Sequence, residues 1–382
     1  MRNKRLDVLR CVAVLLVVLV HGYISSFFYR VGWTGVDLFF VLSGFLISGL
    51  LFSEYKKRQS IGFKRFFIRR GFKIYPSFYL FLLIVCIVSK GIVHDQRTLA
   101  QFLHEVFFVQ NYERGVFDHT WSLAVEEHFY ILLPMFLLVL IRYSSNRENP
   151  FRLIPWAFAA VAMMCIVFRA IAISGEDLNN IAYRGTHTRI DALFFGVLLG
   201  YLYHFRPGIL EKLMQPTRNR VAIAILSAIL LSPAYFFLRN EKFLAIFGYS
   251  TVYLGYGGVL LLSLYVRGVL PKGLARIAGW VGTGLAWVGM YSYSIYLWNG
   301  PTGTWFVGLV RRALHISVGP YERFTIYFFS NFAIGIVMSL LIEYPVLRLR
   351  DRLFPARQIV AVAAQVEVAP APPVAADVAP SA

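Results

Sequence analysis

The chain has 382 residues, of which 58% are hydrophobic and 15% charged, and 38 Lys and Arg against 20 Asp and Glu leave a net charge of +18. A water-soluble domain usually has about a quarter charged residues, so this composition excludes most soluble classes and indicates a membrane protein. The 34 Phe, 22 Tyr and 7 Trp exclude a disordered chain. Cys11, Cys86 and Cys165 lie far apart in apolar runs, which indicates neither a disulfide framework nor a zinc site.

Apolar stretches of about twenty residues, the length that crosses a bilayer, recur between short polar connections along most of the chain. The fold class predicted from them is an all-α, polytopic transmembrane helix bundle of about ten spans. The predicted spans are 8–27, 35–53, 74–92, 121–141, 153–174, 190–205, 221–238, 243–265, 282–299 and 324–342.

Basic residues between the predicted spans set the orientation of the bundle. Lys and Arg gather on the side of the N-terminus, which the positive-inside rule makes cytoplasmic. Ten spans would then leave both termini in the cytoplasm. After Phe354 the composition changes to Ala, Val and Pro, so we predict an integral-membrane domain over 1–354 and a disordered cytoplasmic tail over 355–382.

The first predicted span contains two candidate functional residues, Arg10 and His21. They are eleven residues apart, which places them on one helix face about 16 Å from each other. An arginine at the cytoplasmic mouth suits an anionic ligand. An ionisable residue at membrane depth is costly, so His21 is a candidate for function, although a neighbouring backbone carbonyl could also satisfy a purely structural histidine.

Asp37 opens the second predicted span. The turn between the first two spans centres near Tyr29, so an antiparallel helix pair would bring His21 and Asp37 to a similar depth. A carboxylate beside an imidazole favours the cation that forms when histidine accepts a proton, as a general base does. The alternative is that Asp37 only caps the second helix.

Arg69, Arg70 and Lys73 end a basic run just before the third predicted span. Such a cluster can clamp phosphates, but positive-inside topology and anionic lipids also favour basic residues here. Glu126 and Glu127 are adjacent carboxylates near the start of the fourth span. They point about 100° apart on a helix, so one of them can face a cavity.

Arg189 and Asp191 open the sixth predicted span. We expect them to pair with each other or with groups on neighbouring helices. His119 and His128 do not have a familiar metal-ligand spacing, so we predict no metal site.

Seven motifs in this order resemble the integral-membrane acyltransferase family 3, from about Arg5 to Pro345. They are Arg10-x10-His21, Gly35-Val-Asp37-Leu-Phe-Phe-Val-Leu-Ser-Gly44-Phe-Leu-Ile, Arg69-Arg70-x-x-Lys73-Ile-Tyr-Pro76, Trp121-Ser-Leu-x-x-Glu126-x-x-Phe-Tyr130, Thr188-Arg-Ile-Asp191-Ala-Leu-Phe-Phe-Gly196, Ser292-Tyr-Ser-Ile-Tyr-Leu-Trp298 and Glu343-Tyr-Pro345. The resemblance implies transfer of an acyl group, commonly acetyl, from cytoplasmic acyl-CoA to a hydroxyl. The implied acceptor is usually a sugar of a surface or exported glycan such as lipopolysaccharide, and sometimes a small product such as a macrolide.

The resemblance also implies roles for individual residues. The implied catalytic residues are His21 as general base, Asp37 and Glu126. The implied acyl-CoA-binding residues are Arg10, Arg69, Arg70 and Lys73. The implied substrate-pocket residues are Trp121, Ser122, Tyr130, Arg189 and Asp191. A sugar ring would stack on the indole of Trp121. Direct attack on the thioester and a covalent acyl-histidine relay both stay open.

Two positions depart from the family pattern. Lys73 stands where the basic motif usually has a second Arg, and Asn299 stands where many members have His. The family implies a multi-pass protein of a bacterial-type inner (plasma) membrane, whose partners are acyl-CoA, a carbohydrate acceptor and the lipid bilayer. No tightly bound cofactor and no nucleic-acid partner are expected, and the oligomeric state is left open. The alternative is a transporter or flippase of a glycan or lipid-linked intermediate, against which the lack of an internal sequence repeat argues.

Overall fold

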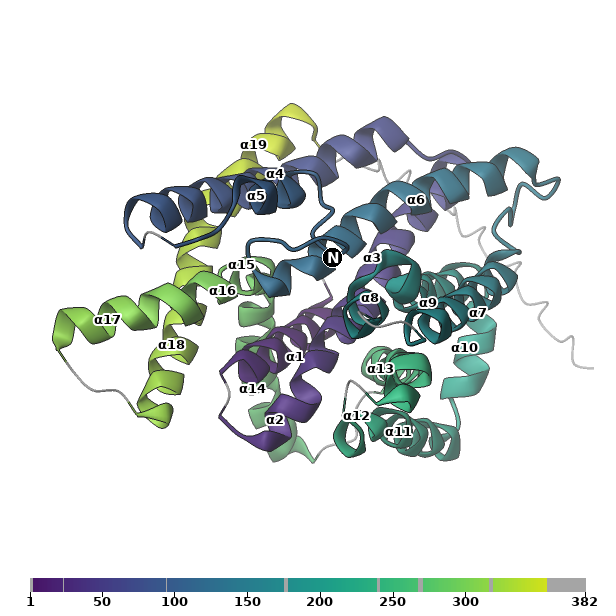
Figure 1. The fold of residues 1–382 in the computed structure, drawn as a ribbon. Helices are drawn as coiled ribbons and strands as arrows, with labels where there is room; N and C mark the ends of the chain where they lie inside the picture. The colour runs from purple at the N-terminus through teal and green to yellow at the C-terminus, as the bar shows by residue number, and fades with distance from the viewer. Residues whose placement is uncertain are drawn as a thin grey trace, which may run out of the picture.

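The computed structural model describes residues 3–22, 24–93, 95–174, 178–238, 241–266, 271–315 and 319–355. Every regular element in these ranges is helical, which confirms the all-α part of the predicted fold class (Figure 1). The tail predicted over 355–382 lies outside the described residues from position 356 onward.

Each predicted span overlaps one or more of the helices. The helices of the first half are α1 (Lys4–His21), α2 (Ser26–Val31), α3 (Gly35–Arg58), α4 (Phe63–Gly91), α5 (Leu99–Val106), α6 (Trp121–Tyr143), α7 (Ile154–Ala172), α8 (Leu178–Arg184) and α9 (Thr186–Phe205). Those of the second half are α10 (Pro207–Met214), α11 (Thr217–Leu231), α12 (Pro233–Phe236), α13 (Tyr249–Tyr265), α14 (Lys272–Met290), α15 (Ser292–Leu297), α16 (Asn299–Pro301), α17 (Val307–Leu314), α18 (Pro320–Met338) and α19 (Tyr344–Leu353). Short 3-10 and π segments adjoin them at Gly32–Thr34, Asp118–Thr120, Leu244–Gly248, Thr302–Phe306 and Ser339–Glu343.

The number of helices that can cross a membrane differs from the prediction. Among the described residues seven helices are long and apolar enough, or eight when the bent pair Ile181–Phe205 and Pro207–Met214 is taken as one span. The count of ten and the location of the termini are therefore not confirmed. The predicted span 8–27 is not among the helices that can cross a membrane, because α1 carries four charged side chains and ends at His21. The predicted span 282–299 is interrupted between α14 and the short α15.

Two close helix pairs form the centre of the bundle. α3 packs along α9, and α1 packs along α14 (Figure 1). Glycine makes both contacts possible, because a Cβ at Gly44 would collide with the carbonyl oxygen of Leu193, and a Cβ at Gly289 would collide with that of Asp7. Close backbone contact of this kind is typical of helices that associate in membranes.

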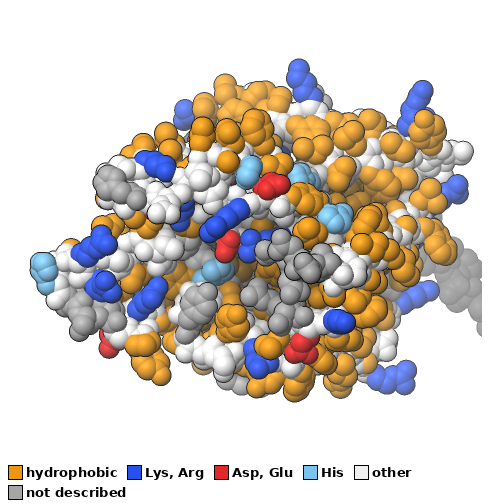
Figure 2. Space-filling view, in the orientation of Figure 1, with side chains coloured by type: hydrophobic (Ala, Val, Ile, Leu, Met, Phe, Trp, Pro, Cys, Tyr) orange, Lys and Arg blue, Asp and Glu red, His pale blue; other side chains and the backbone are white. Residues whose placement is uncertain are grey.

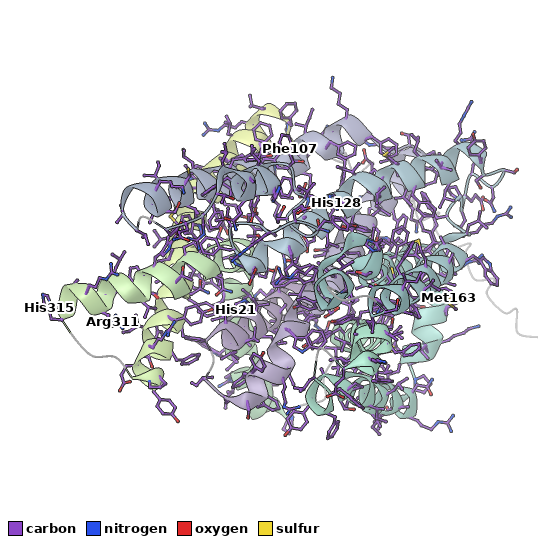
Figure 3. All side chains as sticks on the ribbon, in the orientation of Figure 1. His21, Phe107, His128, Met163, Arg311 and His315 are labelled. Atoms are coloured by element: carbon purple, nitrogen blue, oxygen red, sulfur yellow. The ribbon has the colours of Figure 1, made fainter. Side chains whose placement is uncertain are left out.

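The outer helices expose apolar side chains. Trp156 and Met163 on α7 and Ile225 and Ile229 on α11 are all exposed, and Met163 lies at the edge of the bundle (Figure 3). Apolar side chains cover much of the face drawn in Figure 2. Such a surface is costly in water and favourable in lipid, so the chain is a multi-pass membrane protein.

Candidate active site

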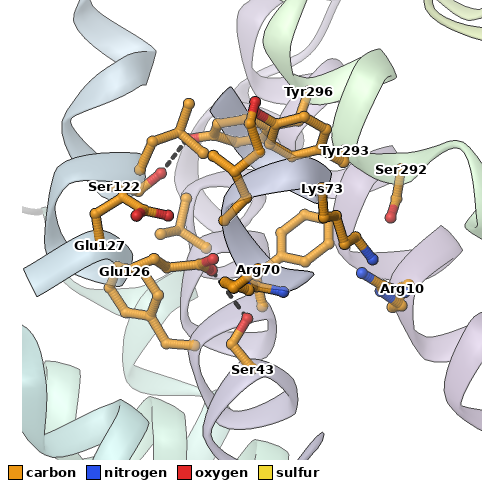
Figure 4. A pocket seen from close by; sticks show the side chains of 15 residues that line it. Arg10, Ser43, Arg70, Lys73, Ser122, Glu126, Glu127, Ser292, Tyr293 and Tyr296 are labelled. Atoms are coloured by element: carbon orange, nitrogen blue, oxygen red, sulfur yellow. Dashed lines mark hydrogen bonds between the residues drawn. The ribbon is translucent and has the colours of Figure 1, made fainter. Parts of the chain in front are cut away.

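A narrow inner cavity of about 60 Å³ lies among α1, α3, α4, α6 and α15 (Figure 4). Cations enter it from two helices: Arg10 from α1, and Arg70 and Lys73 from α4. Two carboxylates, Glu126 and Glu127, enter it from α6. Hydroxyl groups come from Ser43, Ser122, Ser292, Tyr293 and Tyr296. A space of this volume holds a few water molecules or one extended chain, and is too small for a sugar ring.

Arg70 is held in the cavity wall by an aromatic ring. Its guanidinium carbon lies 3.8 Å from the centroid of the Tyr130 ring. The Tyr130 hydroxyl donates a hydrogen bond to Glu126, which also accepts one from Ser43 at 3.0 Å. The buried Nε of Arg70 has no hydrogen-bond partner. A buried donor without a partner is rare in folded proteins.

Glu126 and Glu127 are held by different helices. Glu126 bonds to Ser43 on α3, whereas Glu127 accepts a hydrogen bond from the Tyr75 hydroxyl on α4 at 3.2 Å. Both carboxylates line the inner cavity.

Arg10 and Lys73 also line a second pocket, of about 490 Å³, near the start of α1. Their side-chain ends face each other in Figure 4. Like charges that converge in this way favour an anion between them, although the carboxylates Asp7 and Glu343 line the same pocket. The two cations therefore lie at the junction of the inner cavity with this second pocket.

Arg69 does not join the other three cations. Its guanidinium donates to Asp351 at 2.9 Å and to the carbonyl oxygen of Phe354, so it attaches the end of α19 to α4. The structure thus divides the predicted phosphate-binding cluster. Arg10, Arg70 and Lys73 come together, and Arg69 lies on another face of α4.

His21 ends α1 and lines an outer pocket of about 780 Å³ (Figure 3). Its Nδ1 lies 2.7 Å from the carbonyl oxygen of Val17. A carbonyl oxygen only accepts hydrogen bonds, so Nδ1 carries the proton and Nε2 has the lone pair in the neutral ring. His119 lies nearby, with 6.3 Å between the two ring centroids, and its Nε2 donates to the carbonyl oxygen of Leu297 at 3.1 Å.

Tyr296 lies between the inner cavity and the outer pocket. Its hydroxyl donates to the backbone carbonyl of His119 at 2.6 Å and accepts from the Ser122 hydroxyl at 2.6 Å. Tyr296 and Ser122 line the inner cavity, whereas His119 lines the outer pocket. Tyr296 thus connects the wall of the inner cavity to the backbone of the outer pocket.

Asp37 is not bonded to His21, which corrects the predicted imidazole–carboxylate pair. It accepts a hydrogen bond from Arg189 at 2.6 Å, and its second oxygen has no hydrogen-bond partner. The chain between α1 and α3 forms α2 and a 3-10 turn, which leaves Asp37 in the first turn of α3, within reach of α9. Asp191 pairs with Arg169 of α7, so the partners of Arg189 and Asp191 lie on neighbouring helices.

Trp121 has no open face for a sugar. Its side chain is 3% exposed. Its ring packs against Phe40 and Tyr183, with centroid distances of 5.9 and 4.8 Å, and the Arg189 guanidinium lies 5.4 Å from it. The predicted substrate pocket is therefore divided. Ser122 lines the inner cavity, and Tyr130 packs against Arg70 behind the cavity wall. The other three residues, Trp121, Arg189 and Asp191, are buried and do not line it.

Several residues of these cavities received no role from the sequence. Ser43, Ser292, Tyr293 and Tyr296 line the inner cavity. All four lie within the motifs that resemble the acyltransferase family, so membership of these motifs was the signal for them in the sequence. Asn299, which departs from the family pattern, is buried and accepts a hydrogen bond from Tyr327 of α18.

An apolar helical bundle with converging cations inside it and a histidine beyond them fits the integral-membrane acyltransferases. The chain belongs to acyltransferase family 3, whose model, described as an acyltransferase domain, matches residues 3–346. This confirms the resemblance inferred from the motifs.

Curated relatives carry related names. The chain is 28% identical to the peptidoglycan O-acetyltransferase OatA of Listeria monocytogenes, over 89% of this chain and 55% of the relative. It is 29% identical to a putative peptidoglycan O-acetyltransferase, YrhL of Bacillus subtilis, over 78% and 48%. It is 28% identical to a putative O-acetyltransferase of Staphylococcus aureus, over 77% and 49%. The chain thus spans about half the length of these relatives, and no solved structure matches it.

Proposed function

We propose that this chain is an O-acetyltransferase of a bacterial-type inner membrane that moves an acetyl group from acetyl-CoA to a hydroxyl of a carbohydrate. The observation that carries the proposal is the convergence of Arg10, Arg70 and Lys73 in one narrow cavity, together with the position of Arg10 and His21 on the same helix. The names of two relatives refer to O-acetylation of peptidoglycan, which supports a sugar hydroxyl as the acceptor.

The donor occupies the pocket at the start of α1 and the inner cavity. Arg10, Arg70 and Lys73 bind the phosphates of acetyl-CoA, and the extended pantetheine arm enters the cavity. Arg10 and His21 are about 16 Å apart along α1, a distance comparable to the length of that arm. Glu126 acts as a positioning residue, because it fixes Tyr130, whose ring lies against Arg70. The donor is a substrate and leaves as CoA.

His21 is the general base. Its Nε2 takes the proton of the acceptor hydroxyl, and the hydroxyl oxygen attacks the thioester carbonyl carbon. The carbon–sulfur bond then breaks, and the CoA thiolate accepts the proton from the imidazolium. The bond from Nδ1 to Val17 keeps the ring in the tautomer that this step needs. In this proposal the thioester passes Tyr296 on its way to His21. A covalent acyl-histidine at Nε2 is the two-step form of the same transfer.

The narrow cavity favours chemistry over transport. A volume of about 60 Å³ admits a single chain and no glycan, so a flippase path through the inner cavity would need far larger movements than acyl transfer.

Adjacent arginines provide a matched test of donor binding. We expect Arg70→Ala to raise the KM for acetyl-CoA about tenfold or more, because it removes a charged contact with a phosphate. Arg69→Ala removes the same type of side chain from the next position, where the structure pairs it with Asp351. The assignment is wrong if the two variants change KM equally in radiolabelled acetyl transfer.

A further inference from the structure

The outer pocket is large enough for a ring-shaped acceptor. Its volume of about 780 Å³ falls within the range of about 300–1,000 Å³ typical of small-molecule sites. Its walls come from the end of α1, the segment 95–119, Gly300 of α16 and Thr304 just after that helix. Histidine and charged side chains gather near the middle of the face drawn in Figure 2, with apolar surface around them.

The charges that line this pocket do not favour an anion. Two arginines face three carboxylates. Arg97 is paired with Asp95, and Asp118 is paired with Arg184 at 3.3 Å. Phosphate or carboxylate groups of an acceptor would find no surplus positive charge here, whereas hydroxyl groups can bond to paired charges and amides alike.

Arg97 forms a flat surface in the pocket wall. Its guanidinium carbon lies 4.4 Å from the centroid of Phe117 and 5.0 Å from that of Trp305. Its Nε donates to the carbonyl oxygen of Val116 at 3.0 Å, which fixes the plane. A fixed planar group with hydrogen-bonding edges suits a sugar ring, which has apolar faces and a polar rim.

The wall around Arg97 is held rigidly from behind. Glu105 of α5 is fully buried and accepts hydrogen bonds from the Val116 backbone at 3.0 Å and from the Thr120 hydroxyl at 2.6 Å. His104 donates to the Arg114 carbonyl at 3.0 Å. The pocket is therefore formed before any ligand arrives, which lowers the entropy cost of binding.

We infer that the outer pocket is the acceptor site and that it selects uncharged carbohydrate, with one hydroxyl directed at His21. This inference rests on the proposed acyl transfer. It goes beyond that proposal by naming the site and the charge class of the acceptor.

The test blocks the pocket by adding bulk. Gln96 is exposed and lines the pocket, so Gln96→Trp fills space without removing a buried contact. Gln215→Trp, at an exposed position outside the pocket, is the matched control. The proteins, in lipid nanodiscs, receive radiolabelled acetyl-CoA and the envelope glycans of the organism that carries the chain, separated by anion exchange into uncharged and anionic fractions.

We expect label in the uncharged fraction. We also expect Gln96→Trp to need about ten times more of that fraction for half-maximal rate, with the half-saturating acetyl-CoA concentration unchanged. Label in the anionic fraction, label in neither fraction, or equal behaviour of the two Trp variants would overturn the inference. Failure of the wild-type protein to bind acetyl-CoA would instead overturn the proposed function.

Discussion

Asp37 and Arg189 form a fully buried ion pair next to the pair of Asp191 and Arg169. Removing one partner of a buried pair leaves an uncompensated charge, which costs about 3–5 kcal/mol. We therefore expect Asp37→Asn to lower the thermal unfolding temperature of the protein in detergent strongly. Asp351→Asn breaks an exposed pair with Arg69, worth about 0–1 kcal/mol, and serves as the control. Equal effects of the two substitutions would contradict a structural role for Asp37.

The sequence indicated candidate functional residues but not the partners that the structure gives them. Arg69 and Arg70 are adjacent, so a helix directs them about 100° apart. Arg70 faces the cavity, whereas Arg69 contacts Asp351 of α19, which lies 282 residues later in the chain. Asp37 likewise finds its partner 152 residues away, on α9. Spacing within one helix contains no information on such long-range contacts.

Among the elements, α5 and the segment that follows it depend on one carboxylate. Burial raises the pKa of Glu105 to about 7, because the folded state disfavours its charged form. The stability that protonated Glu105 contributes is therefore fully present below pH 4.5, the ordinary pKa of the side chain. It is lost as the pH rises through about 7. We expect the unfolding temperature to fall between about pH 5 and about pH 8, and Glu105→Gln to flatten that slope.

Glu113→Gln is the control for this pH dependence. Glu113 is an exposed carboxylate on the same segment. If Glu105→Gln leaves the slope as steep as Glu113→Gln does, Glu105 is not the titrating group.

Long helices were predictable and short ones were not. Hydrophobic runs of about twenty residues indicate spans directly, and each predicted span overlaps a helix. The short α5 and α8 lie outside the predicted spans, and contacts with the rest of the bundle stabilise helices of this length. This is why the sequence indicated only His21 in the outer pocket, which is otherwise built largely on α5 and the segments around it, whereas it indicated several residues of the inner cavity.

For the whole molecule, the orientation in the membrane is still a prediction from charge. The basic connections are expected on the cytoplasmic side, and the outer pocket on the opposite side. We expect a membrane-impermeant maleimide to label Glu113→Cys in intact cells and Lys57→Cys only after lysis. Both positions are exposed, and the native Cys11 and Cys165 are buried. The reverse pattern would invert the assignment of donor and acceptor sides.

Acetyl transfer by a His21→Ala variant in nanodiscs tests the central claim most directly. A general base contributes about 10²–10⁴-fold to rate, so we predict at least about a hundredfold loss of labelled acetyl on the acceptor, with acetyl-CoA affinity kept. His315→Asn alters an exposed histidine at the far end of α17 (Figure 3) and should leave the rate unchanged. Transfer by His21→Ala at near the wild-type rate would contradict the account.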